Sequence, residues 1–197
     1  MDKPVKAQRR TRADALKNRE RVLEAAKTVF STGGAETSLE AVARHAGVGI
    51  GTLYRHFPTR QCLFEAVYRR EVDHLVELAE ELKSDPRPVD ALRRWLRANV
   101  EFVATKKGMV AALALAAQGS STLTAYSLDR LGQAVGNLLQ RAVSAGEIRN
   151  DISAEDVLRT LVGLCYTHDK PGWQASVLRL VDVFVDGLCC RGAAGGV

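Results

Sequence analysis

Apolar residues recur at helical spacing along most of this chain. Between residues 22 and 30 they form a single stripe of Val22, Leu23, Ala26, Val29 and Phe30, the spacing that puts side chains on one face of a helix. The alternation of apolar and polar residues that is typical of strands does not occur over comparable lengths. The sequence therefore predicts an all-α fold.

Glycine and proline divide these stripes into about nine helices. We expect the first helix to end at the Gly33-Gly34 pair and to be preceded by an arm over residues 1–15. Thr37 and Glu40 have the spacing of a capping box, which predicts that Thr37 caps a short second helix closed by Gly47. The remaining helices are expected near 49–57, 59–83, 89–106, 108–118, 122–145, 153–168 and 173–190.

The basic residues are concentrated at one end of the chain. The net charge is +5, yet residues 1–60 hold twelve Lys and Arg against six Asp and Glu, while the remaining 137 residues hold sixteen against seventeen. A polyanion favours such localised positive charge, because each neutralised phosphate releases condensed counterions. Binding to an anionic membrane is disfavoured, because no strongly apolar helix face accompanies these charges. The expected partner is nucleic acid.

The sequence lacks the signatures of several functional classes. No apolar run approaches the roughly 20 residues that span a bilayer, and the polar N-terminus lacks the apolar core of a signal peptide, so we expect a cytoplasmic protein. The four histidines lie far apart, and neither a GxxxxGK[ST] phosphate loop nor an HExxH motif occurs. An enzyme or a ligand carrier is therefore the disfavoured alternative, and we expect no catalytic residue, metal site or cofactor.

The four cysteines have no zinc-binding spacing. In a reducing compartment they are expected to be idle thiols. The adjacent pair Cys189-Cys190 leaves a redox sensor open as an alternative.

Residues 37–57, TSLEAVARHAGVGIGTLYRHF, have the pattern of a helix-turn-helix. Two short helices flank a tight turn at Gly47, and the small Ala43 lets them cross closely. Val48, Leu53 and Phe57 are expected to anchor the second helix, which leaves the residues between them free to face the major groove of DNA. Short helical corners also occur in purely structural settings, so spacing alone leaves that alternative open.

The run AGVGIGTLYRHFPTRQCLFEAV resembles the signature of the TetR family of bacterial transcriptional regulators. The resemblance covers about 60 contiguous residues, and its most specific part is GTLYRHFP at 51–58. It implies that Thr52, Tyr54 and His56 bind backbone phosphates, that Tyr54 also reaches a base, and that Arg60 adds a further phosphate contact. Thr37 and Ser38 lie at a helix N-terminus, whose free amides suit a phosphate.

Contacts to base edges are expected from Gly49, Ile50, Gly51 and Arg55. The guanidinium of Arg55 fits the O6/N7 edge of guanine. Gly49 stands where the family usually has serine, and Ile50 stands where polar or basic residues are common. Two alternatives remain for Ile50, a buried side chain or a contact with a thymine methyl group. Because few side chains are then left to contact bases, we expect the shape of the operator to contribute more than usual to its recognition.

The arm contains three arginines, Arg9, Arg10 and Arg12. It is either a disordered solubilising tail or a DNA-binding arm in the minor groove or along the phosphates.

The C-terminal part is expected to bind a small molecule. Asn99 lies within an apolar stripe from Leu92 to Val103, so it is expected to be buried and must either satisfy a backbone carbonyl or orient a ligand. Charged groups are scarce in the expected lining, which favours a largely apolar or aromatic effector. The candidate ligand-binding residues are Trp95, Asn99, Phe102, Met109, Leu113, Gln118, Tyr126 and Tyr166.

The helix near 173–190 is apolar around most of its circumference and needs cover on several sides. The resemblance implies that it and the helix near 153–168 pack against their symmetry mates, so that a homodimer binds a palindromic operator on double-stranded DNA. We therefore expect a DNA-binding domain over 1–60, a ligand-binding and dimerisation domain over 61–197, and a repressor released by its effector. An activator or an architectural DNA-binding protein is the alternative in the same class.

Overall fold

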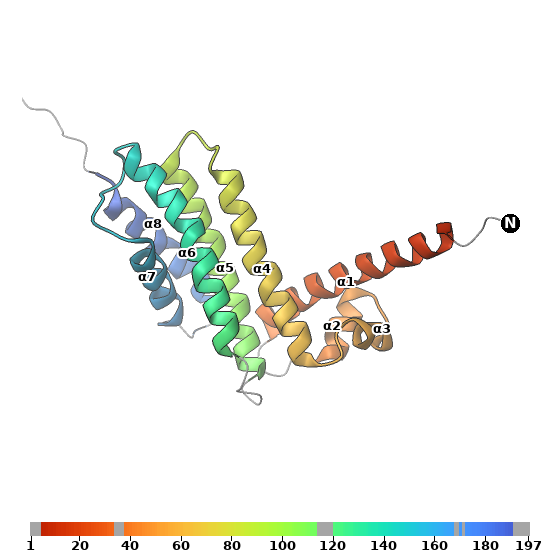
Figure 1. The fold of residues 1–197 in the computed structure, drawn as a ribbon. Coiled ribbons are helices and arrows are strands. Elements are labelled where there is room, and N and C mark those ends of the chain that lie inside the picture. Colours follow the sequence, from red (N-terminus) through yellow and green to blue (C-terminus); the bar gives the residue numbers. More distant parts are fainter. Residues whose placement is uncertain (1–4, 34–37, 114–119, 168–169, 171, 191–197) are drawn as a thin grey trace, which may run out of the picture. The chain divides into compact units, whose positions relative to one another are not determined.

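The computed structural model describes residues 5–33, 38–113, 120–167, 170 and 172–190. Within these residues the chain forms eight helices and no extended sheet, which confirms the all-α prediction (Figure 1). The helices are α1 (Val5–Gly33), α2 (Leu39–Ala46), α3 (Ile50–His56), α4 (Arg60–Leu82), α5 (Pro88–Leu113), α6 (Ser120–Ser144), α7 (Ala154–Tyr166) and α8 (Trp173–Leu188).

The chain divides into two compact units. The head unit comprises Met1–Arg69 and Thr105–Gln118, and the body unit comprises Arg70–Ala104 and Gly119–Val197. Because the boundaries fall within α4 and α5, each of these helices contributes residues to both units.

The head unit is built around the C-terminal half of α1, against which α2 and α3 pack (Figure 1). Its core contains Leu23, Phe30 and Leu53, all almost fully buried. The ring of Phe30 stacks on that of Phe64 in α4, with centroids 4.5 Å apart. The apolar stripe predicted between residues 22 and 30 therefore forms the buried face of α1.

The first helix begins eleven residues earlier than the sequence predicted. Helical backbone starts at Val5, so the predicted arm over residues 1–15 is wrong, and Arg9, Arg10 and Arg12 belong to α1. The segment KAQRRTRADALKNRE consists largely of good helix formers and contains neither glycine nor proline. Pro4 lies just before the first helical residue, where proline is well tolerated. The side chains of these three arginines lie outside the described residues.

Gly108 does not end a helix, contrary to the expected break between 106 and 108. Helix α5 runs through it to Leu113. A Cβ built on Gly108 would lie 1.9 Å from the carbonyl oxygen of Phe30, far inside van der Waals contact. Glycine is therefore required here by the close approach of α1 to α5 within the head unit, and not by a turn.

In the body unit, Trp95 is completely buried and its indole Nε1 donates to the carbonyl oxygen of Leu75, 2.8 Å away. This bond joins α5 to α4. Helix α7 begins with a capping box, in which the Ser153 hydroxyl accepts from the amide of Asp156 and the Asp156 carboxylate accepts from the amide of Ser153. No described helix is long and apolar enough to cross a membrane.

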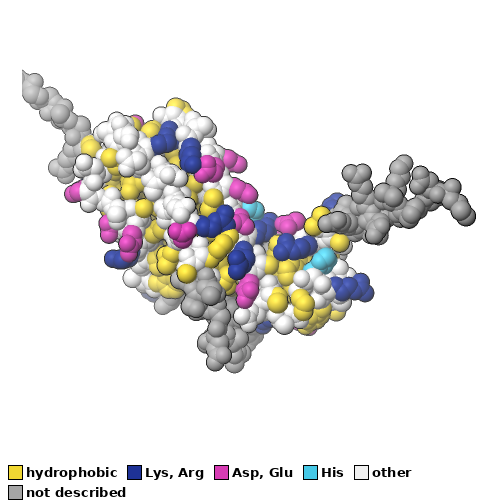
Figure 2. All heavy atoms as spheres, viewed as in Figure 1, with side chains coloured by type: hydrophobic (Ala, Val, Ile, Leu, Met, Phe, Trp, Pro, Cys, Tyr) yellow, Lys and Arg dark blue, Asp and Glu magenta, His cyan; other side chains and the backbone are white. Residues whose placement is uncertain are grey.

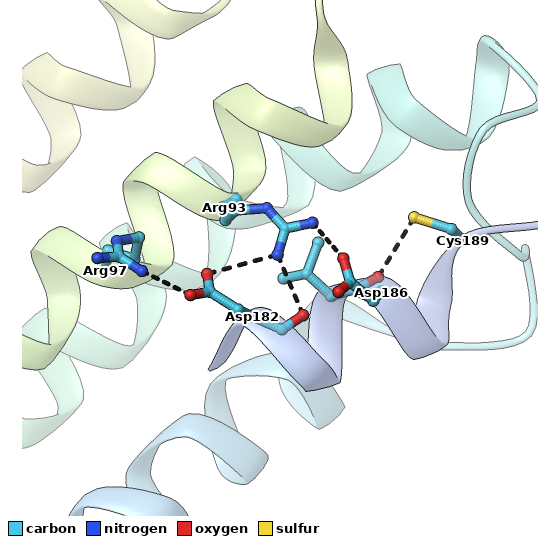
Figure 3. Close-up of polar contacts among 6 residues, drawn as sticks. Arg93, Arg97, Asp182, Asp186 and Cys189 are labelled. Atoms are coloured by element: carbon cyan, nitrogen blue, oxygen red, sulfur yellow. Dashed lines mark hydrogen bonds and ion pairs between the residues drawn. The ribbon is translucent and has the colours of Figure 1, made fainter. Parts of the chain in front are cut away.

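Four charged side chains join α5 to α8 in the body unit (Figure 3). Arg93 contacts Asp186 at 2.5 Å and donates to the backbone carbonyl of Asp182 at 3.1 Å, while Arg97 contacts the Asp182 carboxylate at 2.8 Å. This cluster could not be predicted from the sequence, because its members lie 85 to 93 residues apart.

Candidate nucleic-acid interface

Ser38, and not Thr37, caps the helix that opens the predicted helix-turn-helix. Ser38 has an extended backbone (φ −94°, ψ 156°) and its hydroxyl accepts from the amide of Ala41 at 3.1 Å. The predicted Thr37–Glu40 capping box is therefore wrong by one residue, because either of two adjacent hydroxyl residues has the chemistry of a cap. Thr37 itself lies outside the described residues.

The turn between α2 and α3 depends on Gly47. Its φ of 63° lies in the left-handed region, which favours glycine. The amide of Val48 donates to the carbonyl of Ala43 at 3.0 Å, which closes the end of α2. From α1, Arg21 donates to the carbonyl oxygen of Gly47 at 3.3 Å. The turn is thus tied both to α2 and to α1.

Helix α3 has one buried and one exposed side. Leu53 and Phe57 are 0% and 3% exposed and anchor it in the head unit, as predicted. The guanidinium of Arg19 lies over the ring of Phe57, 5.4 Å from its centroid, which adds a contact from α1. The anchors fix the orientation of α3 and leave its opposite side open to solvent.

The exposed side of α3 carries Ile50, Gly51, Tyr54 and Arg55. Ile50 is 38% exposed and Tyr54 is 44% exposed, so the alternative of a buried Ile50 is wrong. Gly49 is the N-cap of α3 and supplies no side-chain hydrogen bond. Apolar and basic side chains lie beside one another over this part of the head unit (Figure 2).

The expected phosphate-binding residues border this surface. Thr52 and His56 are half-buried in α3, and Arg60 is the first residue of α4. The guanidinium of Arg60 lies 5.6 Å from the centroid of the Phe64 ring, which restrains its direction. Two further exposed residues, Arg44 and His45, lie at the end of α2. This pair was not among the predicted contact residues, although its position in the last turn before Gly47 can be seen in the sequence.

Three of the expected ligand-binding residues share the buried side of α5 in the body unit. Trp95, Asn99 and Phe102 are 0%, 2% and 6% exposed. The polar group of Trp95 is satisfied by the carbonyl of Leu75. The Nδ2 atom of Asn99 finds no hydrogen-bond partner within the described part of the protein. Asn99 was expected either to bond to a backbone carbonyl or to orient a ligand. The bond from its amide nitrogen to a backbone carbonyl is not observed among the described residues.

The other expected ligand-binding residues have different surroundings. Met109 is buried in the head unit. The Tyr126 hydroxyl donates to Asp73 at 3.2 Å and accepts from Arg130. Tyr166 is 46% exposed near the end of α7. Gln118 and the side chain of Leu113 lie outside the described residues.

A groove of about 670 Å³ lies on the body unit between residues 149–151 and the end of α8. Its charged side chains are paired, Arg149 with Asp151 and Asp186 with Arg93. Such a lining does not match a largely apolar effector, because an apolar ligand would remove water from these charged side chains and offer no hydrogen bonds in return.

The two adjacent cysteines lie beside this groove and differ in environment. The Cys189 thiol is half-buried and donates to the carbonyl of Val185 at 3.4 Å (Figure 3). Cys190 is exposed. Burial raises the pKa of Cys189, which lowers its thiolate fraction. The described residues contain no cluster of histidine, cysteine and acidic side chains suited to a metal ion.

Comparisons with known proteins agree on one family. Residues 22–67 match the family described as "Bacterial regulatory proteins, tetR family", and residues 87–190 match "Transcriptional regulator SbtR-like, C-terminal domain". A TetR transcriptional regulator from Streptomyces coelicolor is 39% identical, with a TM-score of 0.79 over 88% of this chain and 99% of that one. A TetR regulatory protein from Mycobacterium vanbaalenii is 34% identical, with a TM-score of 0.73 over 91% and 99%.

Curated relatives match over a shorter stretch. An HTH-type transcriptional regulator of Staphylococcus aureus strain USA300 is 37% identical over 75 residues, which is 38% of this chain. This chain spans 40% of the length of that relative.

Proposed function

Because this chain belongs to the TetR family of bacterial transcriptional regulators and is not an enzyme, we propose that it is a homodimeric repressor released from its operator by a small molecule. Residues 1–60 bind DNA, and residues 61–197 bind the effector and form the dimer. The protein acts in the cytoplasm, where its operator lies. The observation that carries the proposal is the exposed side of α3, held outward by the buried Leu53 and Phe57.

Helix α3 enters the major groove, which is wide enough to admit one helix. Arg55 contacts guanine, because its guanidinium is exposed and matches the O6/N7 edge. Thr52, Tyr54, His56 and Arg60 contact phosphates, joined by Thr37 and Ser38 at the start of α2, and these contacts set the register of the protein on the duplex. Gly49, Ile50 and Gly51 lie against base edges.

The N-terminal part of α1 adds a second basic contact through Arg9, Arg10 and Arg12. A helix with its side chains is about 10–12 Å wide, whereas the minor groove is about 6 Å wide. The helical form of this segment therefore favours a contact along the phosphates over insertion into the minor groove.

The effector binds in the body unit and is largely apolar or aromatic, with one hydrogen-bond acceptor. Support comes from Asn99, which is 2% exposed while its Nδ2 atom has no partner in the described residues. An unpaired buried amide is costly, and a ligand oxygen that accepts its hydrogen bond removes that cost. Trp95 and Phe102 on the same side of α5 supply apolar surface. Tyr126 and Tyr166, which belong to the same unit, remain candidates for further contacts, while a role for Met109, Leu113 and Gln118, which belong to the head unit, stays a prediction from the sequence.

The dimer forms through α7 and α8. Both helices expose large apolar side chains, Val162 at 42% and Tyr166 at 46% on α7, and Leu180 at 37% and Val183 at 67% on α8. Burial of such a surface against a second copy favours association. A two-fold dimer presents two α3 helices to the halves of a palindromic operator.

Release follows if the effector binds more tightly to a dimer whose two α3 helices are wrongly spaced for the operator. The effector shifts the equilibrium only by its preference between the two forms. Operator affinity then falls by the same factor by which the operator weakens effector binding.

The deciding experiment measures binding of the purified protein to duplex DNA from upstream of its own gene, across a series of salt concentrations and against random DNA. We expect selective binding that weakens steeply with salt, because phosphate contacts release counterions. Arg55→Met should weaken binding to the upstream duplex by about 1–3 kcal/mol and leave the affinity for random DNA almost unchanged. The proposal would be contradicted if the protein bound duplexes from its own upstream region and duplexes from a random-sequence library with the same affinity.

A further inference from the structure

The first turn of α3 presents one apolar side chain between two bare stretches of backbone. Ile50 is 38% exposed. Gly49 and Gly51 on either side have no side chain, and a Cβ built at either position meets no atom within 4 Å. Ile50 is therefore the only side chain among residues 49–51, all of which the structure describes, and it has open space on both sides.

The position of Ile50 on the helix places it on the DNA-facing side. At 3.6 residues per turn, Ile50 and Tyr54 form one row of the exposed surface and Gly51 and Arg55 form the next. Recognition helices contact base edges mainly with their N-terminal residues. Ile50 is the N-terminal residue of α3, so the part of the helix that reaches deepest into the groove carries a branched alkyl group.

The chemistry of an alkyl side chain restricts which base it can contact. Isoleucine neither donates nor accepts a hydrogen bond, so it would leave the donors and acceptors of guanine, cytosine and adenine unpaired against it. Thymine alone presents an apolar group in the major groove, its C5 methyl. We propose that Ile50 contacts the C5 methyl group of one thymine in each operator half-site and so determines the base pair at that position.

This inference rests on the proposed function, since it names the specificity of the same interface. The contact removes about one methyl group from water, which corresponds to about fourfold in affinity for each half-site. Two half-sites in a symmetric operator make the effect about 15-fold.

The test uses the full-length protein and an operator selected from a random duplex library. Each thymine is then replaced by deoxyuridine, symmetrically in both half-sites, which removes the methyl group and leaves base pairing unchanged. We expect one thymine position at which the replacement weakens binding about 15-fold. In the Ile50→Ala variant, whose side chain is too short to reach the methyl, the same replacement has no further effect, while the other thymine positions behave as in the wild type.

Ile50→Ala is expected to fold, because Ile50 is exposed, and its helical circular dichroism and thermal midpoint verify this. Wild-type affinity that is the same for every deoxyuridine operator overturns the inference. So does a deoxyuridine effect as large in Ile50→Ala as in the wild type. If the selection recovers no sequence-selective duplex, the proposed function fails as well. If the protein binds selectively but loss of the methyl group has no effect, only the inference about Ile50 fails.

Discussion

The guanidinium of Arg21 donates a hydrogen bond to the carbonyl oxygen of Gly47 at 3.3 Å, across 26 residues of sequence. The bond joins α1 to the turn that sets the angle between α2 and α3. Gly47 adds a second constraint, because its φ of 63° is a conformation that other residues adopt at a cost. The orientation of α3 thus depends on the backbone conformation of Gly47 and the side chain of Arg21, together with the buried anchors Leu53 and Phe57.

Gly47→Ala is expected to lower the free energy of unfolding by about 1–2 kcal/mol, because a Cβ is strained at this positive φ. The new Cβ would also lie 2.6 Å from the Arg21 guanidinium, which must then move. Urea denaturation measures the change. Gly51→Ala is the matched control, since its Cβ meets nothing within 4 Å and alanine in a helix is favoured over glycine by up to about 1 kcal/mol. If both variants changed the free energy of unfolding in the same direction, the positive φ of Gly47 would not be the cause of the loss in Gly47→Ala.

Gly108→Ala is expected to destabilise the protein by about 1–3 kcal/mol, because the added methyl group overlaps the carbonyl oxygen of Phe30 and α1 must shift. Thermal and urea unfolding give the size of the loss. Gly132→Ala in α6 makes the same substitution where a Cβ meets no atom within 4 Å, and there we expect a small gain. An unchanged midpoint in Gly108→Ala would rule out the close approach of α1 and α5.

Asn99→Leu is expected to raise the free energy of unfolding of the ligand-free protein by about 1 kcal/mol, because it replaces a buried, unpaired amide with an apolar group of similar size. Trp95→Phe, on the same side of α5, is expected to have the opposite effect, because it removes the indole N–H that donates to Leu75 and leaves a smaller ring in a fully buried position. Urea denaturation of both variants tests the contrast. A loss of stability in Asn99→Leu would mean that Asn99 has a structural partner and is not held for a ligand.

Val183→Glu is expected to shift the protein from dimer to monomer, because Val183 is 67% exposed on α8 and the glutamate carries charge into the proposed interface. Sedimentation equilibrium measures the mass, and operator affinity should fall in parallel. Leu128→Glu introduces the same charge at a position on α6 that is 58% exposed, and it should leave the mass unchanged. Dissociation of the dimer by Leu128→Glu alone would place the interface on α6.

The capping box of α7 predicts a dependence of stability on pH. Hydrogen bonds from Ser153 hold the pKa of Asp156 below its ordinary value of 3.8. A lowered folded-state pKa contributes stability above the unfolded value, and this contribution disappears as the pH falls through the folded value. The difference in unfolding free energy between wild type and Asp156→Asn should therefore be constant near neutral pH and shrink below about pH 4. In a Ser153→Ala background the shrinkage should be smaller, since the hydroxyl that donates to the carboxylate is gone.

The parts of the fold that depend on local sequence were predictable. The spacing of Leu53 and Phe57 predicted the buried side of α3, and Gly47 predicted the turn. The cap of α2 was assigned one residue too early, because Thr37 and Ser38 are adjacent and have equivalent chemistry. Local rules thus locate an element and leave its first residue ambiguous.

The parts that depend on distant residues were not predictable. Gly108 has the local appearance of a helix stop, and its actual cause is Phe30, 78 positions earlier in the sequence. The bond from Arg21 to Gly47 and the ion pair of Arg93 with Asp186 likewise need the fold before they can be recognised. For the candidate site, the sequence left open whether Ile50 is buried or faces outward, and the structure was needed to establish that it is exposed.

The bare backbone at Gly49 and Gly51 also makes the head a convenient scaffold for engineering. A side chain introduced at either position enters solvent and meets no neighbouring atom within 4 Å of its Cβ, so the core of the head need not be repacked. Asparagine, glutamine or arginine placed there could each add a bidentate contact to a base, with about 1–3 kcal/mol of discrimination for a good pair. New operator sequences are therefore within reach of one or two substitutions, and the anchors Leu53 and Phe57 can be left untouched.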